Sequence, residues 1–571
     1  MLSDQLEVGQ QSVFVLSNIA RSSMEEDKDK VRENLLRDSE KLTERSEERE
    51  RDRERVTFDD VLSHLGEFGL EQKINYLKFS LPYVMSAMQL MGWVFVGAEI
   101  SHRCRLPEEV GLGRENISFY SNNSDWETSS CSRTLKETNV SEYCEDGWVY
   151  DRSQVEDSVT SDWDLVCNNE GLRATIGASP MSGYLVGGFV FGILTDKIGR
   201  KPTFMLANFL MLTGGLLGAV SPEFFTFVIS RMITGFAIAG VEAACFVMGM
   251  ELVGPSKRTL AGIVCWFFET TGLLSALGLA YLVRDDWRLL QVLYSAPAVV
   301  FLAYWWAAPE SIRWLVARGR TGEAAELIQR AARRNKVEVR EELILAMEET
   351  IKLELAEEEA GRTYTAVDLF RYPNLRCKTL ILLLCWITCA SLYYVLLLDQ
   401  SELSDNKYVG FLITAGVQIP GYVYVILTLE QPMFGRKKSL CLFLILCGLA
   451  LSTHPLVPAE YPTVRITISV IGRFAANCSY TILNLFSAEQ FPTVVRGVGM
   501  GFAVVVSRTG TMLAPYILLL GHFSPVIFGL SALLSGLCAL LLPETLGKKM
   551  PETLQDGEKL AVRFPGMGGR E

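Results

Sequence analysis

Residues 174–201 read ATIGASPMSGYLVGGFVFGILTDKIGRK, and this stretch decides the class of fold. Its first part, 174–195, contains no Asp, Glu, Lys or Arg. A helix of about 20 apolar residues is long enough to cross the hydrocarbon core of a bilayer. The charged cluster DKIGRK then follows at 196–201, as expected where a span ends at a membrane surface. The stretch therefore predicts one membrane-spanning helix and the short loop that follows it.

Similar apolar runs recur along the whole chain. Hydrophobic residues make up 49% of it and gather into runs about as long as a bilayer core is thick. One or two such runs fit a buried core helix, but a dozen joined by short charged loops argue against a soluble enzyme. The predicted spans are 76–98, 174–195, 203–220, 224–250, 259–283, 287–308, 378–398, 408–429, 439–455, 466–488, 497–520 and 523–542. The sequence thus predicts an all-α membrane protein with twelve transmembrane helices.

The distribution of charge predicts the orientation. Lys and Arg are enriched in cytoplasmic loops. They occur in the loops after the second and eighth spans, at 196–201 and 434–438, and are missing from those after the third and eleventh. Both termini are therefore expected to be cytoplasmic, in a multi-pass protein of the plasma membrane. Much of the net charge of −12 lies in the segments 24–55 and 318–362, so it gives no indication of a nucleic-acid partner.

The long segment 99–173 between the first two spans is expected outside the cell. It contains N-glycosylation sequons at Asn116, Asn122 and Asn139. It also contains four cysteines, and an even number in an oxidising compartment favours two disulfides, although the spacing leaves the pairing open. These are Cys104, Cys131, Cys144 and Cys167. No spacing of Cys and His along the chain resembles a metal site, and no cofactor is expected.

The chain repeats itself at a nearly constant offset. Glu251 and Arg258 follow the fourth span as Glu489 and Arg496 follow the tenth. A Pro-Glu pair follows both the sixth and the twelfth spans, and the FGRKK loop at 434–438 resembles the IGRKP loop at 198–202. Such duplication predicts two six-helix halves with a site between them near the midplane. The predicted parts are a charged cytoplasmic tail (1–56), an N-terminal half (57–308), a cytoplasmic helical linker (309–377), a C-terminal half (378–542) and a cytoplasmic C-terminal tail (543–571). Within the N-terminal half, an amphipathic helix over 57–72 is expected to lie on the inner membrane surface.

Several of these motifs together resemble a known family. The pattern Gly192-x3-Asp196-Lys197-x-Gly199-Arg200-Lys201 resembles the loop motif of the major facilitator superfamily, and the chain resembles its organic cation/anion/carnitine transporter family (solute carrier family 22) more closely. The segments that carry this are CEDGWVYD (144–151), TSDWDLVC (160–167), PESIRWLVARGR (309–320), EQFPTVVRG (489–497) and LLPETLG (541–547). The resemblance covers about 57–560. It implies an alternating-access carrier with a central cavity lined by both halves.

Charge inside a membrane span is costly and usually functional, and three of the charged residues in the predicted spans stand out. They are Glu242, Glu269 and Arg508, each with small residues at helical spacing. We expect them to bind substrate; the alternative is an internal Glu–Arg pair that locks the bundle. By resemblance, Arg508 matches a basic position of carnitine and anion carriers that is thought to engage a substrate carboxylate. Gln418 falls where cation and carnitine carriers usually carry Glu, so an acid is missing there.

Aromatic residues in the seventh and tenth spans are the other candidates for substrate binding, because a ring face attracts an ammonium group. They are Trp386, Tyr393, Tyr394 and Tyr480. The pair Tyr393–Tyr394 resembles the family's aromatic pair in the seventh span. The alternative for each is plain packing.

Charges in the cytoplasmic loops are expected to form an inner gate, with ion pairs between the halves in the outward-facing state. They are Asp196, Arg200, Glu251, Arg258, Arg436, Glu489 and Arg496. The alternative is charge that sets topology. Arg231 and Arg473, near the outer interface, either reach toward headgroups or take part in an outer gate.

The sequence therefore predicts a carrier for small organic ions and no enzymatic activity. Carboxylates and aromatic rings suit an ammonium end and Arg508 suits an acid end, so carnitine-like or betaine-like zwitterions are favoured slightly over simple cations. Organic anions come third, and a receptor or sensor on the same fold is the rival class. The chain has no G-x4-G-K-[ST] loop of an ATPase, and the coupling ion, Na⁺, H⁺ or none, stays open.

Overall fold

A computed structural model describes residues 58–111, 117, 119, 125–360, 365–399, 403–404, 406–429, 431, 434–458, 460–548 and 550–559. Twelve helices in this part of the chain are long and apolar enough to cross a membrane, and each overlaps one predicted span. The expected all-α membrane architecture is therefore confirmed.

The spans of the first half surround a common core. Their elements are α3 (Leu70–Met91) with α4 (Trp93–Val96), α6 (Glu170–Ile198), α7 (Arg200–Ala219), α8 (Phe224–Glu251), α9 (Arg258–Leu282), and the broken sixth span of α10 (Trp287–Ser295), α11 (Pro297–Leu302) and α12 (Tyr304–Ala307). The helix α6 packs closely on α8, which also contacts α7 and α3. At the closest approach, a Cβ on Gly235 would lie 1.8 Å from the carbonyl oxygen of Pro180, so only glycine fits there.

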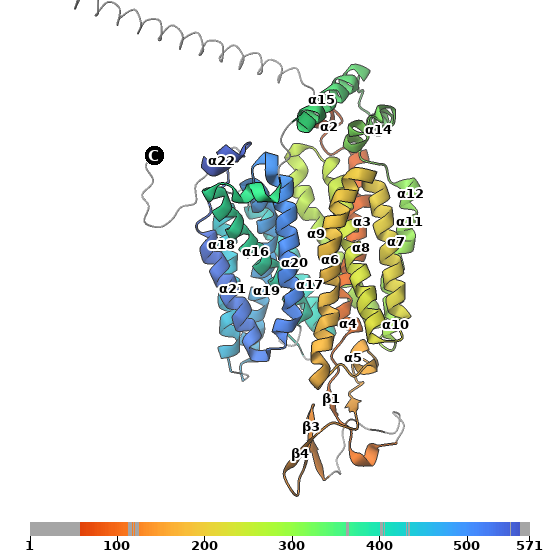
Figure 1. Ribbon diagram of the computed structural model, residues 1–571, viewed down its shortest axis with the longest axis vertical. Coiled ribbons are helices and arrows are strands. Elements are labelled where there is room, and N and C mark those ends of the chain that lie inside the picture. The colour runs from red at the N-terminus through yellow and green to blue at the C-terminus, as the bar shows by residue number, and fades with distance from the viewer. Residues whose placement is uncertain are drawn as a thin grey trace, which may run out of the picture.

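The second half forms a matching bundle beside the first (Figure 1). Its spans are α16 (Pro373–Leu398), α17 (Lys407–Thr428), α18 (Arg436–Thr453), α19 (Pro462–Gln490), α20 (Arg496–Leu518) and α21 (Ser524–Ala539). The halves meet where α20 packs against α6 and α17 packs against α9. Residues on these four helices are therefore placed to act together.

A small strand region projects from one end of the bundle, which we call the strand end (Figure 1). The strand β1 (His102–Cys104) pairs with β5 (Trp148–Tyr150), and β3 (Ser132–Leu135) lies between β2 (Trp126–Thr128) and β4 (Val140–Tyr143), all antiparallel. Disulfides join Cys104 to Cys144 and Cys131 to Cys167, which resolves the pairing that the sequence left open. Such cross-links stabilise a region too small for a large core of its own.

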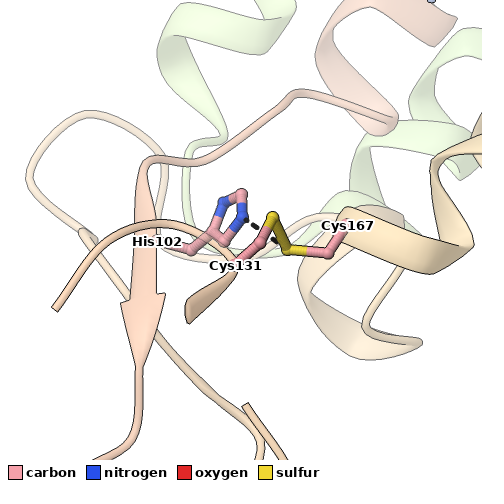
Figure 2. Close-up of side chains that lie close together, drawn as sticks. All are labelled: His102, Cys131 and Cys167. Carbon is pink, nitrogen blue, oxygen red and sulfur yellow. Dashed lines mark hydrogen bonds between the residues drawn. A yellow bond between two sulfur atoms is a disulfide. The ribbon is translucent and has the colours of Figure 1, made fainter. Parts of the chain in front are cut away.

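Two further residues of the strand region bear on the sequence predictions. Asn139 is exposed at the turn between β3 and β4, where its φ of 55° suits an asparagine. The sequons at Asn116 and Asn122 lie outside the described residues. Figure 2 shows His102 beside the Cys131–Cys167 disulfide, with its Nε2 atom 3.8 Å from the Cys167 sulfur. Both sulfurs are joined to each other, so this group offers no thiolate to a metal.

Short helices cover the opposite end, which we call the linker end (Figure 1). They are α2 (Phe58–His64), α13 (Ile312–Ala317), α14 (Thr321–Asn335), α15 (Glu341–Ala360) and α22 (Leu554–Lys559). Val61 and Leu65 are buried among Ile328 and Met347, in a cluster separate from the main core. The expectation that 57–72 lies on the membrane surface is therefore wrong. Residues from Leu70 onward belong to the first span, and the apolar face of α2 is covered by protein.

Candidate functional site

Arg508 lies at the centre of the interface between the halves. Its guanidinium carbon is 3.8 Å from the centroid of the Tyr184 ring, which α6 contributes from the other half. The Tyr184 hydroxyl donates a hydrogen bond of 2.8 Å to Oε2 of Glu242 on α8. Among the described residues, no carboxylate oxygen lies within 4.0 Å of an Arg508 nitrogen, and its buried Nε has no hydrogen-bond partner. The guanidinium is therefore stabilised by a ring face but has no direct anionic partner.

A second group of polar side chains surrounds Glu269 on α9. The Tyr393 hydroxyl, from α16 of the other half, donates to Oε1 of Glu269 at 3.1 Å. Behind it, the Gln418 amide on α17 donates to the Tyr393 oxygen at 3.3 Å. The Gln418 oxygen accepts hydrogen bonds from Thr270 at 2.8 Å and from Tyr422 at 3.3 Å. The buried amide of Gln418 thus has protein partners on both ends and orients Tyr393 toward Glu269.

Aromatic rings connect the two groups. Tyr480 on α19 stacks on Tyr393, with ring centroids 5.4 Å apart and planes 16° apart. Trp266 and Trp386 meet the Tyr480 ring edge-on at 5.6 and 6.0 Å. Glu242 and Glu269 both interact electrostatically with Arg508, so the charges and rings form one central cluster. Glu242, Glu269 and Arg508 each keep part of their surface accessible.

The cluster brings together most, but not all, of the residues that the sequence singled out. Trp386 is buried and donates from its indole nitrogen to Ser487 at 2.9 Å, so it borders the cluster through its ring only. Tyr394 lies elsewhere: its hydroxyl donates to the carbonyl oxygen of Gly177 at 2.7 Å, across the interface toward the strand end. Four residues of the cluster are not singled out by the motifs of the sequence: Tyr184, Trp266, Thr270 and Tyr422.

Each half has a buried arginine near the strand end. Arg231 on α8 donates to the carbonyl oxygens of Gln89 and Leu90 at 2.8 and 3.1 Å. Arg473 on α19 donates to the carbonyl oxygen of Asp399 at 2.6 Å. Arg231 and Arg473 are only 2% and 6% exposed, so neither side chain reaches toward lipid headgroups in this conformation.

The predicted gating charges lie at the linker end and pair within their own halves. Arg200 meets Glu251 at 3.4 Å and Asp196 at 3.3 Å, and Arg436 meets Glu489 at 3.2 Å. Arg258 holds Asp59 of α2 through two contacts of 2.5 and 3.2 Å. Arg496 donates to Thr493 and to the Met550 sulfur. The gate role stays a prediction, and in this conformation these pairs do not join the halves.

The glutamates of the repeated Pro-Glu pairs bind the backbone at the start of one helix in each half. Glu310 accepts from the backbone nitrogens of Arg200 and Lys201, and Glu544 does the same for Arg436 and Lys437. A carboxylate there satisfies free N–H groups at the start of α7 and α18. Gly199 and Gly435 precede these helices with positive φ, and a Cβ on either would lie 2.6 Å from the carboxylate.

The fold and the interface site define a two-half transporter of the major facilitator class. Residues 127–555 match the family model described as "Sugar (and other) transporter". The xylose transporter of E. coli in an inward-open conformation aligns with a TM-score of 0.54, covering 85% of this chain and 100% of that one, at 16% identity. Its partially occluded inward-open form gives 0.53 at 17% identity, over 81% and 98% of the two chains. At such identities, the likeness concerns the fold alone.

Relatives of higher sequence identity define the family more narrowly. The chain is 39% identical to an "Organic cation transporter protein" of Drosophila melanogaster, over 89% of this chain and 95% of that protein. It is 34% identical to human "Organic anion transporter 3", with the same coverage. The chain therefore belongs to the major facilitator superfamily and, within it, to the organic cation and anion transporter family (solute carrier family 22). The resemblance noted in its motifs is confirmed.

Proposed function

We propose that the chain is a plasma-membrane carrier that moves small organic ions by alternating access, with zwitterions of the betaine or carnitine type as its best substrates. The single observation that carries this proposal is the central cluster, where Arg508 has no carboxylate partner among the described residues while two glutamates lie nearby. Substrate binding by Glu242, Glu269, Arg508, Gln418, Tyr393 and Tyr480 is part of this proposal, whereas Trp386 only borders the cluster and Tyr394 lies outside it.

The charges of the cluster favour a substrate that carries an ammonium group. Two carboxylates and one guanidinium leave an excess of negative charge when all three are ionised. A charge in a site of low dielectric constant needs a partner of opposite sign. A substrate ammonium answers Glu242 or Glu269, and the ring faces of Tyr480 and Trp266 add cation–π attraction of about 0.5–2 kcal/mol.

Arg508 distinguishes a zwitterion from a simple cation. A guanidinium matches a carboxylate with two parallel hydrogen bonds. A simple cation would leave Arg508 without such a partner, whereas a substrate carboxylate would supply one. We therefore place zwitterions ahead of simple cations, and organic anions third, because an anion would have to approach two carboxylates.

The contacts between the halves support alternating access. Near the strand end Tyr394 bonds to Gly177, Tyr516 bonds to Thr175, and Phe95 packs on Phe411. At the linker end the gating charges pair within each half, as described above. We infer that this conformation is closed at the strand end, and that the opposite conformation exchanges these contacts for ion pairs between the halves at the linker end.

We assign the strand end to the outside of the cell and the linker end to the cytoplasm. The Lys- and Arg-bearing loops at 196–201 and 434–438 support this orientation, as does the sequon at Asn139. The first and last described helices, α2 and α22, lie at the same end of the bundle (Figure 1), so both termini are proposed to be cytoplasmic. The five-part division predicted above is retained with this orientation.

Uptake of a matched panel tests the proposal. Labelled glycine betaine, choline and succinate are compared in cells that express the chain and in cells that do not. We expect uptake of betaine above choline, and little uptake of succinate. Preferred uptake of succinate would favour an organic anion carrier. Specific binding of all three without uptake would favour a receptor or sensor.

A further inference from the structure

A cavity of about 670 Å³ lies between the halves at the strand end. Sites for small molecules have volumes of this order. Trp93, Gly177 and Pro515 form part of its wall, and Gly177 is also the residue whose carbonyl oxygen accepts from Tyr394. Gly177 precedes Tyr184 by seven residues on α6, which is roughly 10 Å along the helix axis. The cavity is therefore distinct from the central cluster and lies nearer the strand end.

Some of the charges that line this cavity neutralise one another. Arg173 on α6 bonds to Glu99 at 2.7 Å. The guanidinium of Arg173 holds the pKa of Glu99 below its ordinary value, so this pair stays charged at neutral pH. The ion pair of Arg173 with Glu99 therefore leaves little unpaired charge to bind a ligand.

Two other charged side chains that line the cavity lack such a partner within the described residues. Glu170 begins α6 in the first half, and Lys407 begins α17 in the second. Within the described part of the chain, neither side chain makes a hydrogen bond or an ion pair. Glu99 acts on Lys407 at longer range, but Glu99 is already bonded to Arg173. A cation at the first residue of a helix is also opposed by the helix dipole, so an anionic group beside Lys407 would be stabilising.

We propose that this cavity is a second binding site for small zwitterions, whose ammonium group meets Glu170 and whose carboxylate meets Lys407. The inference rests on the substrate class proposed above. Because the two residues belong to different halves, a bound zwitterion stabilises the conformation in which the halves meet at the strand end. A substrate at high concentration on that side then slows its own transport.

The number of sites on the full-length protein tests this. Equilibrium dialysis of the purified chain with labelled glycine betaine should reveal two sites per chain in the wild type. Lys407→Gln and Glu170→Gln should each retain the central site alone, whereas Lys136→Gln, on the exposed hairpin outside the cavity, should keep both. The charge exchange Glu170→Lys with Lys407→Glu should restore the second site, because the ligand can then bind in reverse.

Failure of this inference is distinguishable from failure of the proposed function. Unchanged stoichiometry in Lys407→Gln overturns the cavity site, whether the wild type binds one molecule or two. Arg508→Ala removes the central site only. If Arg508→Ala binds as many molecules as the wild type while Lys407→Gln binds fewer, the cavity holds a zwitterion and the central assignment fails.

Discussion

The guanidinium carbon of Arg508 lies 3.8 Å from the centroid of the Tyr184 ring, and the two residues come from different halves of the transporter. The same tyrosine donates to Glu242 at 2.8 Å. One side chain therefore stands between a cation and an anion that do not touch. By our proposal, a substrate with both charges would supply a partner for each. No ion pair joins Arg508 to Glu242 among the described residues, so the halves could separate without breaking one.

Two substitutions of Tyr184 should separate its ring contact with Arg508 from its hydrogen bond to Glu242. Tyr184→Phe keeps the ring under Arg508 but removes the hydrogen bond to Glu242. A hydrogen bond to a charged group contributes about 1.5–3 kcal/mol, so kcat/KM for betaine should fall roughly tenfold to a hundredfold. Tyr184→Leu removes the ring as well and should lower it further. Equal uptake by the wild type and both variants, at equal surface levels, would remove Tyr184 from the site.

Glu269 should act on every substrate that carries an ammonium group. Glu269→Gln is expected to impair uptake of betaine and choline alike, and Glu242→Gln should act in the same direction. Tyr393→Phe should have a smaller effect, because it removes one hydrogen bond and leaves the charge. Initial rates across a range of substrate concentrations measure these differences.

The same residues offer a control for a structural role. No direct ion pair joins Glu269 to Arg508 among the described residues, so the double variant Glu269→Gln with Arg508→Gln should remain inactive. Recovery of uptake in the double variant would instead indicate a pair that locks the bundle.

The charges at the linker end should govern turnover. In the pair of Arg436 with Glu489, both side chains are largely buried, at 12% and 13% exposure. Glu489→Gln leaves Arg436 without its carboxylate, which costs several kcal/mol in one conformation and shifts the conformational balance. Turnover should fall at least about tenfold, while surface expression changes little. Asp196→Asn should act in the same direction but less, because Asp196 is 77% exposed.

Surface biotinylation and uptake in the same cells check this prediction. Glu349→Gln, on the exposed side of α15, serves as the matched control and should behave as the wild type. Normal uptake by Glu489→Gln and Asp196→Asn at normal surface levels would return these charges to a role in topology.

Orientation has its own test. At least one of Asn116, Asn122 and Asn139 should carry a glycan, so glycosidase treatment should increase gel mobility, and the triple Asn→Gln variant should not respond. An epitope inserted between α14 and α15 should be detected only after permeabilisation. Detection on intact cells would reverse the proposed orientation.

The sequence predicted the spans well because an apolar run of sufficient length is a local property. It predicted the wrong surroundings for the amphipathic segment, because an apolar face packs on lipid or protein alike, and Val61 is in fact covered by α14 and α15.

The residues of the site were predictable only in part. Trp266 and Tyr422 share helix faces with Glu269 and Gln418, at spacings of three and four, and could have been found from the sequence. Tyr184 could not, because its partners depend on how α6 and α20 are rotated against each other. The sequence predicts Tyr393 and Tyr394 as a pair, but adjacent residues of a helix point in different directions, and the Tyr394 hydroxyl bonds to Gly177 instead.

The most direct test of the central claim compares Arg508→Ala with the wild type, using glycine betaine and choline, which are similar in size but differ in the carboxylate. If Arg508 receives a substrate carboxylate, the variant should lose betaine uptake, because removing one partner of a buried charge pair costs about 3–5 kcal/mol. Choline uptake should be preserved or increased at the same surface level. Loss of both substrates in equal proportion, or betaine uptake equal to that of the wild type, would contradict the claim.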